Sequence, residues 1–163
     1  MAIIYDAGLL ARREAQALTP ADVCKIALCG AVAEQLPGAM VYSSAQAQGV
    51  TAPAVFVRFG KLSARERLGG LEQVTLEAQC RYLPLAAEDD GENETAMQAM
   101  LDALLALCGG EADFGTQNRT AERTETGAAA KGEVRFEIRR KDAAGLAEGI
   151  MQRLELTAQG FPD

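Results

Sequence analysis

Residues 53–84, PAVFVRFGKLSARERLGGLEQVTLEAQCRYLP, decide the fold, because they contain two strand-like runs that meet at Gly69-Gly70. Glycine adopts the positive φ angles of tight hairpin turns without a steric penalty. The stretch therefore predicts a long β-hairpin that spans about residues 54–83.

The register of this hairpin can be tested by folding the chain at the two glycines. With Leu68 opposite Leu71, the pairs further along are Arg67 with Glu72, Phe59 with Cys80 and Val57 with Tyr82. The apolar positions of both strands then share one face at the base, and an arginine faces a glutamate near the tip. A slip of one residue would turn one apolar set to the other face, so the agreement supports the hairpin. A β-bulge within residues 61–67 is compatible with it.

The two ends of the hairpin differ in polarity. The base carries apolar side chains that can enter a core, namely Val55, Phe56, Val57, Phe59, Cys80 and Tyr82. The tip carries polar ones, namely Lys61, Ser63, Arg65, Glu66, Arg67, Glu72 and Gln73. Two interpretations stay open: a solvated β-arm, or an arm that contacts a neighbouring subunit, since a two-stranded ribbon is only marginally stable alone.

Length and charge limit the class of protein. A chain of 163 residues fits one domain with its own core, and we expect a domain at residues 19–163 preceded by an N-terminal arm at residues 1–18. The net charge of −7 argues against specific nucleic-acid binding by phosphate neutralisation. No apolar run is long enough to span a membrane. These features favour a soluble protein of the cytoplasm.

The sequence contains few of the residue patterns that catalytic sites need, so we predict no enzyme activity, no cofactor and no metal site. Histidine is absent, which excludes histidine-based triads and histidine–metal sites. The acidic turn at residues 88–94 lacks the spacing of a calcium loop. The four cysteines sit in apolar patterns without C-x-x-C spacing and are predicted to be buried thiols.

The first half of the chain predicts one clear helix. Thr19 is placed as N-cap, Pro20 as first helical residue and Asp22 at the third position of a helix over residues 21–36. A short strand is expected at residues 39–43. The N-terminal arm carries apolar side chains, among them Ile3 and Tyr5. They suggest that the arm packs against an apolar surface, and another subunit is one candidate for that surface.

The second half predicts another helix and further strands. Residues 96–107 read as a helix capped by Asn93 or Thr95, and residues 127–132 as a flexible turn. Residues 133–139 alternate strictly, with Val134, Phe136 and Ile138 facing inward. A terminal strand is expected at residues 150–157. The whole pattern predicts an α+β fold with a mixed or antiparallel sheet, a long β-hairpin and two main helices packed on one face.

This order of elements resembles the tail terminator (tail completion) proteins of double-stranded DNA phages and prophages. The resemblance rests on the helix at residues 21–36, the PAVFV strand start at residues 53–57 and the RYLP strand end at residues 81–84. It also uses a second helix at residues 97–107 and a late strand at residues 134–138, and it covers residues 20–141. The N-terminal arm and the terminal strand go beyond the pattern.

The resemblance implies a structural role with no catalytic residues. Such proteins form a homo-oligomeric, hexameric ring that caps the tail tube and meets the head connector, so assembly in the bacterial cytoplasm and a place in the virion tail are expected. For subunit or tube contacts we favour the hairpin tip and the arm, through Arg65, Glu66, Arg67, Glu72, Ile3 and Tyr5. The alternatives are another head–tail joining (neck) protein, or a small cytosolic protein-binding or regulatory domain that builds no ring.

Overall fold

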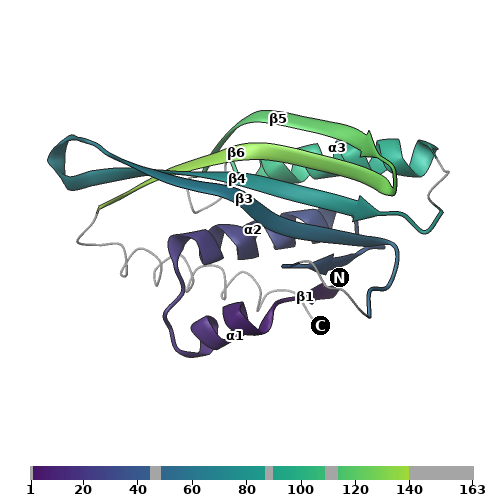
Figure 1. The fold of residues 1–163 in the computed structure, drawn as a ribbon, viewed down its shortest axis with the longest axis horizontal. Coiled ribbons are helices and arrows are strands. Elements are labelled where there is room, and N and C mark those ends of the chain that lie inside the picture. Colours follow the sequence, from purple (N-terminus) through teal and green to yellow (C-terminus); the bar gives the residue numbers. More distant parts are fainter. Residues whose placement is uncertain (1, 45–48, 87–89, 109–113, 140–163) are drawn as a thin grey trace.

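A single mixed sheet of six strands carries its helices on one face, as a computed structural model shows for residues 2–44, 49–86, 90–108 and 114–139 (Figure 1). The predicted α+β class is confirmed. The elements in chain order are β1 (Ala2–Ile4), α1 (Ala7–Glu14), α2 (Pro20–Gln35), β2 (Met40–Tyr42), β3 (Ala54–Glu66), the 3₁₀ turn η1 (Leu68–Gly70), β4 (Leu71–Leu83), α3 (Asp90–Ala106), β5 (Gly115–Thr124) and β6 (Gly127–Arg139).

The sheet combines a parallel and an antiparallel part. Its strand order is β1-β2-β3-β4-β6-β5. The first three strands run parallel, whereas β3, β4, β6 and β5 pair antiparallel. The long hairpin β3–β4 joins the two parts and extends along the long axis of the molecule (Figure 1).

Local sequence explains where α2 begins. The Thr19 hydroxyl accepts the amide of Asp22, and the Asp22 carboxylate accepts the amide of Thr19, so the two residues form a capping box. Pro20 occupies the first turn, where a missing N–H costs nothing. The predicted helix start is confirmed.

The core lies between the sheet and the two main helices, α2 and α3, which contact each other on the same face. Aliphatic side chains fill it without exposure, among them Val23, Leu28, Val32, Val55, Val57, Leu76, Leu104 and Val134. The inward set predicted for the late strand is confirmed, because Val134, Phe136 and Ile138 are all buried.

The predicted hairpin exists, but its predicted register is wrong. Val57 lies opposite Cys80, and Phe59 lies opposite Ala78. The register shifts by one residue between Phe59 and Lys61, which places a bulge at Gly60, just before the stretch where one was anticipated. The connection is also longer than two residues, since the Arg67 amide donates to the Leu71 carbonyl around η1. The base register therefore differs from the prediction by two positions, which keeps the same faces together.

Near the tip the difference is one position, so the predicted pair of Arg67 with Glu72 is wrong. Glu66 lies opposite Glu72, and Arg65 lies opposite Gln73. The Arg67 guanidinium instead donates to the Gln73 side chain at 2.9 Å and approaches the Glu137 carboxylate at 3.9 Å.

Two expectations for the second half need correction, and one strand was not anticipated. Helix α3 begins at Asp90, six residues early, so Asn93 is a fully buried helical residue and not a cap. The polar, threonine-rich residues 115–124 form strand β5, and residues 127–132 are the first half of β6 and not a flexible turn. The terminal strand expected at residues 150–157 lies outside the described residues. No helix in the described parts is long and apolar enough to cross a membrane.

Candidate interaction surface

The outer half of β3 has an unpaired edge within the described residues. Strand β2 pairs only with Ala54, Val55 and Phe56 at the base of β3, whereas β4 pairs with β3 along almost its full length. From residue 57 to residue 66 the second edge of β3 has no strand beside it in the described parts of the chain. Such an edge offers backbone N–H and C=O groups to another chain.

Two leucines lie exposed on the same arm, which we define as the hairpin from Gly60 to Leu71. Leu68, in the 3₁₀ turn at the tip, is 95% exposed, and Leu62 is 62% exposed. A scattered exposed leucine is ordinary on a protein surface. Leu68, however, is almost wholly in solvent at the end of the hairpin, where β6 pairs with β4 as far as Leu71 and makes the sheet three-stranded. It contributes nothing to its own core and suits insertion into a partner.

The charged residues predicted for this surface are all at the tip. Arg65, Glu66 and Arg67 are exposed, and Glu72 is half-buried across the strand from Glu66. The structure thus brings four of the six predicted site residues together, and Leu68 lies between them in the turn. Whether they contact a neighbour stays a prediction.

The other two predicted residues lie away from the hairpin tip: Ile3 is in β1, which forms an edge of the sheet, and Tyr5 follows it (Figure 1). Ile3 and Tyr5 are half-buried and pack against the domain's own core. Burial, followed by the nearby Cys29 thiol, raises the pKa of Tyr5 to about 12. Ile4 points outward and is 39% exposed.

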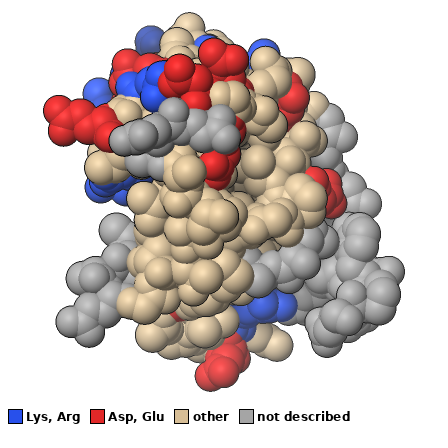
Figure 2. All heavy atoms as spheres, turned by 90° about the vertical axis from the view of Figure 1, so that its right-hand side faces the viewer, with Lys and Arg blue, Asp and Glu red and all other residues tan. Residues whose placement is uncertain are grey.

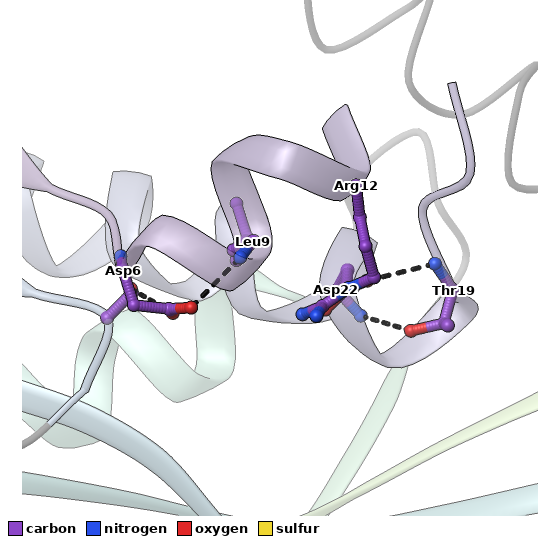
Figure 3. Close-up of polar contacts among 6 residues, drawn as sticks. Asp6, Leu9, Arg12, Thr19 and Asp22 are labelled. Carbon is purple, nitrogen blue, oxygen red and sulfur yellow. Dashed lines mark hydrogen bonds and ion pairs between the residues drawn. The ribbon is translucent and has the colours of Figure 1, made fainter. Parts of the chain in front are cut away.

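Two polar clusters fasten the first segment to the domain (Figure 3). The Asp6 carboxylate accepts the Leu9 amide at 2.9 Å, and it accepts the Ser43 hydroxyl at 2.8 Å. Partial burial opposes ionisation of Asp6, but these hydrogen bonds outweigh it and lower its pKa. Helix α1 is thereby capped by a residue that also joins β1 to the end of β2.

The second cluster joins α1 to the start of α2. The Arg12 guanidinium binds both carboxylate oxygens of Asp22, with Nε–Oδ2 at 2.7 Å and Nη2–Oδ1 at 2.8 Å. Burial of Asp22 opposes its ionisation, yet the hydrogen bonds from Arg12 and Thr19 lower its pKa. A bidentate pair of this kind fixes geometry as well as charge.

The cysteines provide no reactive centre in the core. Burial raises the pKa of Cys24, Cys29 and Cys80 to about 12, so these thiols stay protonated at neutral pH. Cys108 is half-exposed, and its Sγ lies 2.6 Å from the Thr116 hydroxyl. Among the described residues no group of three or more ligating side chains is placed to hold a metal ion.

Sequence reasoning missed the leucines of the arm. In the sequence, Leu62 and Leu68 stand among polar residues and glycines, a pattern that indicates a solvated strand end. The signal that identifies Leu68 is its place beside Gly69-Gly70: a large apolar side chain in a tight turn has no core within reach.

The comparison with known families gives one match. The family model described as "Phage tail terminator protein" matches residues 25–143, which include β2, β3, β4, α3, β5, β6 and most of α2. No curated protein matches the chain.

Proposed function

Because the chain belongs to the phage tail terminator protein family, and is thus a structural protein of the phage tail, we propose that it forms a closed homo-oligomeric ring. We assign six subunits to this ring. It caps the end of the finished tail tube with one face and presents the other to the head connector. The chain assembles in the host cytoplasm and remains in the virion tail.

The observation that supports this proposal best is the arm. A ring is built by heterologous contacts, in which one surface of a subunit binds a different surface of the next. The arm offers an unpaired strand edge over residues 60–66 of β3 within the described parts of the chain, and it ends in the exposed Leu68. Strand pairing with a neighbour would supply main-chain hydrogen bonds, and leucine burial would supply apolar area.

We place the receiving end of this contact at the N-terminal edge of the neighbouring subunit. Strand β1 pairs with β2 on one side only within the described residues, and Ile4 is exposed there. Ile3 and Tyr5 then act indirectly, since they hold β1 in place through their packing on the core. Arg65 and Arg67 at the tip add charge that selects the register of the contact.

Light scattering of the purified protein over a wide concentration range tests the proposal. The expected result is a mass of six chains for the native protein. Leu68→Ser combined with Leu62→Ser should reduce the mass to that of one chain while the thermal unfolding temperature stays unchanged, because both side chains are exposed.

Leu85→Ser is the matched control. Leu85 is 75% exposed but lies after β4, away from the arm, so this variant should assemble like the native protein. A native protein that stays a monomer or a dimer at all concentrations, and that forms no ring on purified tail tubes, would contradict the ring and favour a small protein-binding domain.

A further inference from the structure

The face of the sheet that carries no helix in the described parts of the chain, called the open face below, is basic, although the chain as a whole is acidic. Strand register and alternation place seven bases on this open face, namely Arg58, Lys61, Arg65, Arg81, Lys131, Arg135 and Arg139. They place four acids there, namely Glu77, Glu122, Glu133 and Glu137. The other described residues hold six bases and eleven acids. The open face therefore carries a net positive charge, whereas the other described residues together carry a net negative one.

A cavity of about 400 Å³ lies on the open face near the base of the hairpin. Strands β3, β4, β6 and β5 all contribute to it, with Arg58, Arg81 and Lys131 as its cations and Glu122 as its one acid. Phe56 and the alanines of β6 supply apolar area. The cavity thus combines an apolar lining with an excess of positive charge.

The two arginines of this cavity are held in place but not neutralised. The Arg58 Nε donates to the side-chain Oε1 of Gln79 at 2.9 Å, and the Arg81 guanidinium donates to the Thr126 hydroxyl at 2.9 Å. Among the described residues, no carboxylate lies within ion-pair distance of Arg58, Arg81 or Lys131. Neutral partners orient Arg58 and Arg81 and leave their charge available to a carboxylate from outside.

The charge pattern favours an acidic protein surface over nucleic acid. Glu77 and Glu133 lie opposite each other in the centre of the open face. They would repel a phosphate backbone, and surfaces that bind DNA are far more uniformly positive than this one. Apolar area surrounded by arginine is, by contrast, common in contacts between proteins.

A second copy of the chain provides such an acidic surface on its helix side. Glu34 near the end of α2 and Glu94 in the first half of α3 are both exposed, and neither has an ion-pair partner in the described parts of the chain. Asp90 is exposed too, although Arg123 pairs with it. Figure 2 looks at the end of the molecule at the right of Figure 1 and shows charged side chains gathered toward the β5 and α3 side, above a largely uncharged middle.

We propose that the basic open face of one subunit binds the acidic helix side of the next, with the carboxylates of α2 and α3 entering the cavity at Arg58, Arg81 and Lys131. This inference rests on the proposed ring. It names the broad faces that pack between subunits, in addition to the arm. Opposite charge on opposite sides of one sheet is what a head-to-tail arrangement of identical copies requires.

Charge reversal is the first part of the test. Arg58→Glu with Arg81→Glu should raise the concentration at half-dissociation of the ring by about tenfold or more, since like charges then face each other across the contact. Arg58→Lys with Arg81→Lys keeps the charge and is the matched control, for which little change is expected. All four side-chain changes are at exposed positions, so thermal unfolding should stay within a few degrees of the native protein.

Zero-length cross-linking is the second part. A carbodiimide activates a carboxylate, the Lys131 amine attacks it, and an amide forms as the urea leaves. In an assembled mixture of ¹⁴N and ¹⁵N chains, mass spectrometry should find Lys131 of one isotope joined to Glu34 or Glu94 of the other.

The outcomes separate this inference from the ring itself. A native ring that survives the glutamate variant, with Lys131 joined only to carboxylates of its own chain, would overturn the inference and leave the ring intact. A native protein that never assembles, alone or on tail tubes, would overturn both. Binding of a fluorescent DNA duplex that the glutamate variant loses, without any change in assembly, would assign the face to nucleic acid instead.

Discussion

The Tyr82 hydroxyl donates a hydrogen bond of 2.6 Å to the Glu92 carboxylate, and this contact ties the end of β4 to the first turn of α3. The same carboxylate oxygen accepts the Leu85 amide at 3.0 Å. One glutamate therefore fixes the path of the chain as it leaves the sheet. It also explains why α3 begins earlier than its apolar pattern predicts, because Glu92 in the first turn is engaged by the preceding strand.

Tyr82→Phe should lower the free energy of unfolding by about 1–2 kcal/mol. The ring stays in the core, and the loss is one hydrogen bond to a charged acceptor. Chemical denaturation at pH 7 measures the change. Glu94→Gln, at an exposed position of the same helix, should stay within about 0.5 kcal/mol of the native protein. Equal effects of the two variants would show that the hydroxyl contact contributes nothing.

Gly127→Ala should unfold the protein or destabilise it by several times the effect of an ordinary surface change. A Cβ at Gly127 would overlap the Tyr82 carbonyl oxygen, a backbone atom of the neighbouring strand that cannot move without opening the sheet. Gly30→Ala is the matched substitution, because a Cβ there meets nothing within 4 Å inside helix α2. It should stabilise the protein by about 0.5–1 kcal/mol. Circular dichroism during thermal unfolding distinguishes the two, and a tolerated Gly127→Ala would contradict the close packing of β4 on β6.

Stability should fall in acid partly through Asp22. The pKa of Asp22 is lowered in the folded chain. Its carboxylate therefore contributes fully to the free energy of unfolding above the ordinary pKa of 3.8, and this contribution is lost as the pH falls through the pKa of the folded state. Asp22→Ala should cost about 1–2 kcal/mol at pH 7, because it removes the Arg12 pair and half of the capping box. Once the pH falls below the folded pKa of Asp22, the variant and the native protein should converge. Glu34→Ala serves as control, and a gap between Asp22→Ala and the native protein that does not narrow as the pH is lowered from 7 into the acid range would exclude the ionised carboxylate as the cause.

One thiol should react before the other three. Cys108 is half-exposed, whereas Cys24, Cys29 and Cys80 are buried, with the pKa of each raised to about 12. A thiol reagent at pH 8 should therefore label one cysteine in the native protein and all four in denaturant, and Cys108→Ser should abolish the native signal. Because these buried thiols are stable in the protonated form, they should also lower stability as the pH rises from about 9 toward 12. Rapid labelling of several thiols in native protein would show that the core opens.

Features determined by neighbouring residues could be predicted from the sequence. The start of α2 depends on Thr19, Pro20 and Asp22, which lie within one helical turn of each other. The helix begins where these residues predict. The alternation of Val134, Phe136 and Ile138 is likewise a local pattern that the core then uses. The existence of the hairpin followed from Gly69-Gly70 for the same reason.

Features that depend on contacts between residues far apart in the sequence could not be predicted from local patterns. The exact register on each side of the bulge depends on how β3 meets β4. The isolated Gly60 inside the strand pattern is a signal for a bulge, but it does not say how the two strands pair beyond it. Strand β5 carries almost no apolar side chains and is a strand because β6 pairs with it. The basic face needed the strand order itself, since Arg58, Arg81 and Lys131 are far apart in the sequence and meet only across three adjacent strands.

The bulge at Gly60 has a consequence for the length of the arm. It separates the register of the hairpin base, which the core requires, from the register of the outer part. Removing or adding two residues in each strand beyond Gly60 keeps every remaining side chain on its present face, because the side-chain period of a strand is two. Arm length is therefore a dimension that evolution or an engineer can change in steps of about 7 Å without disturbing the core.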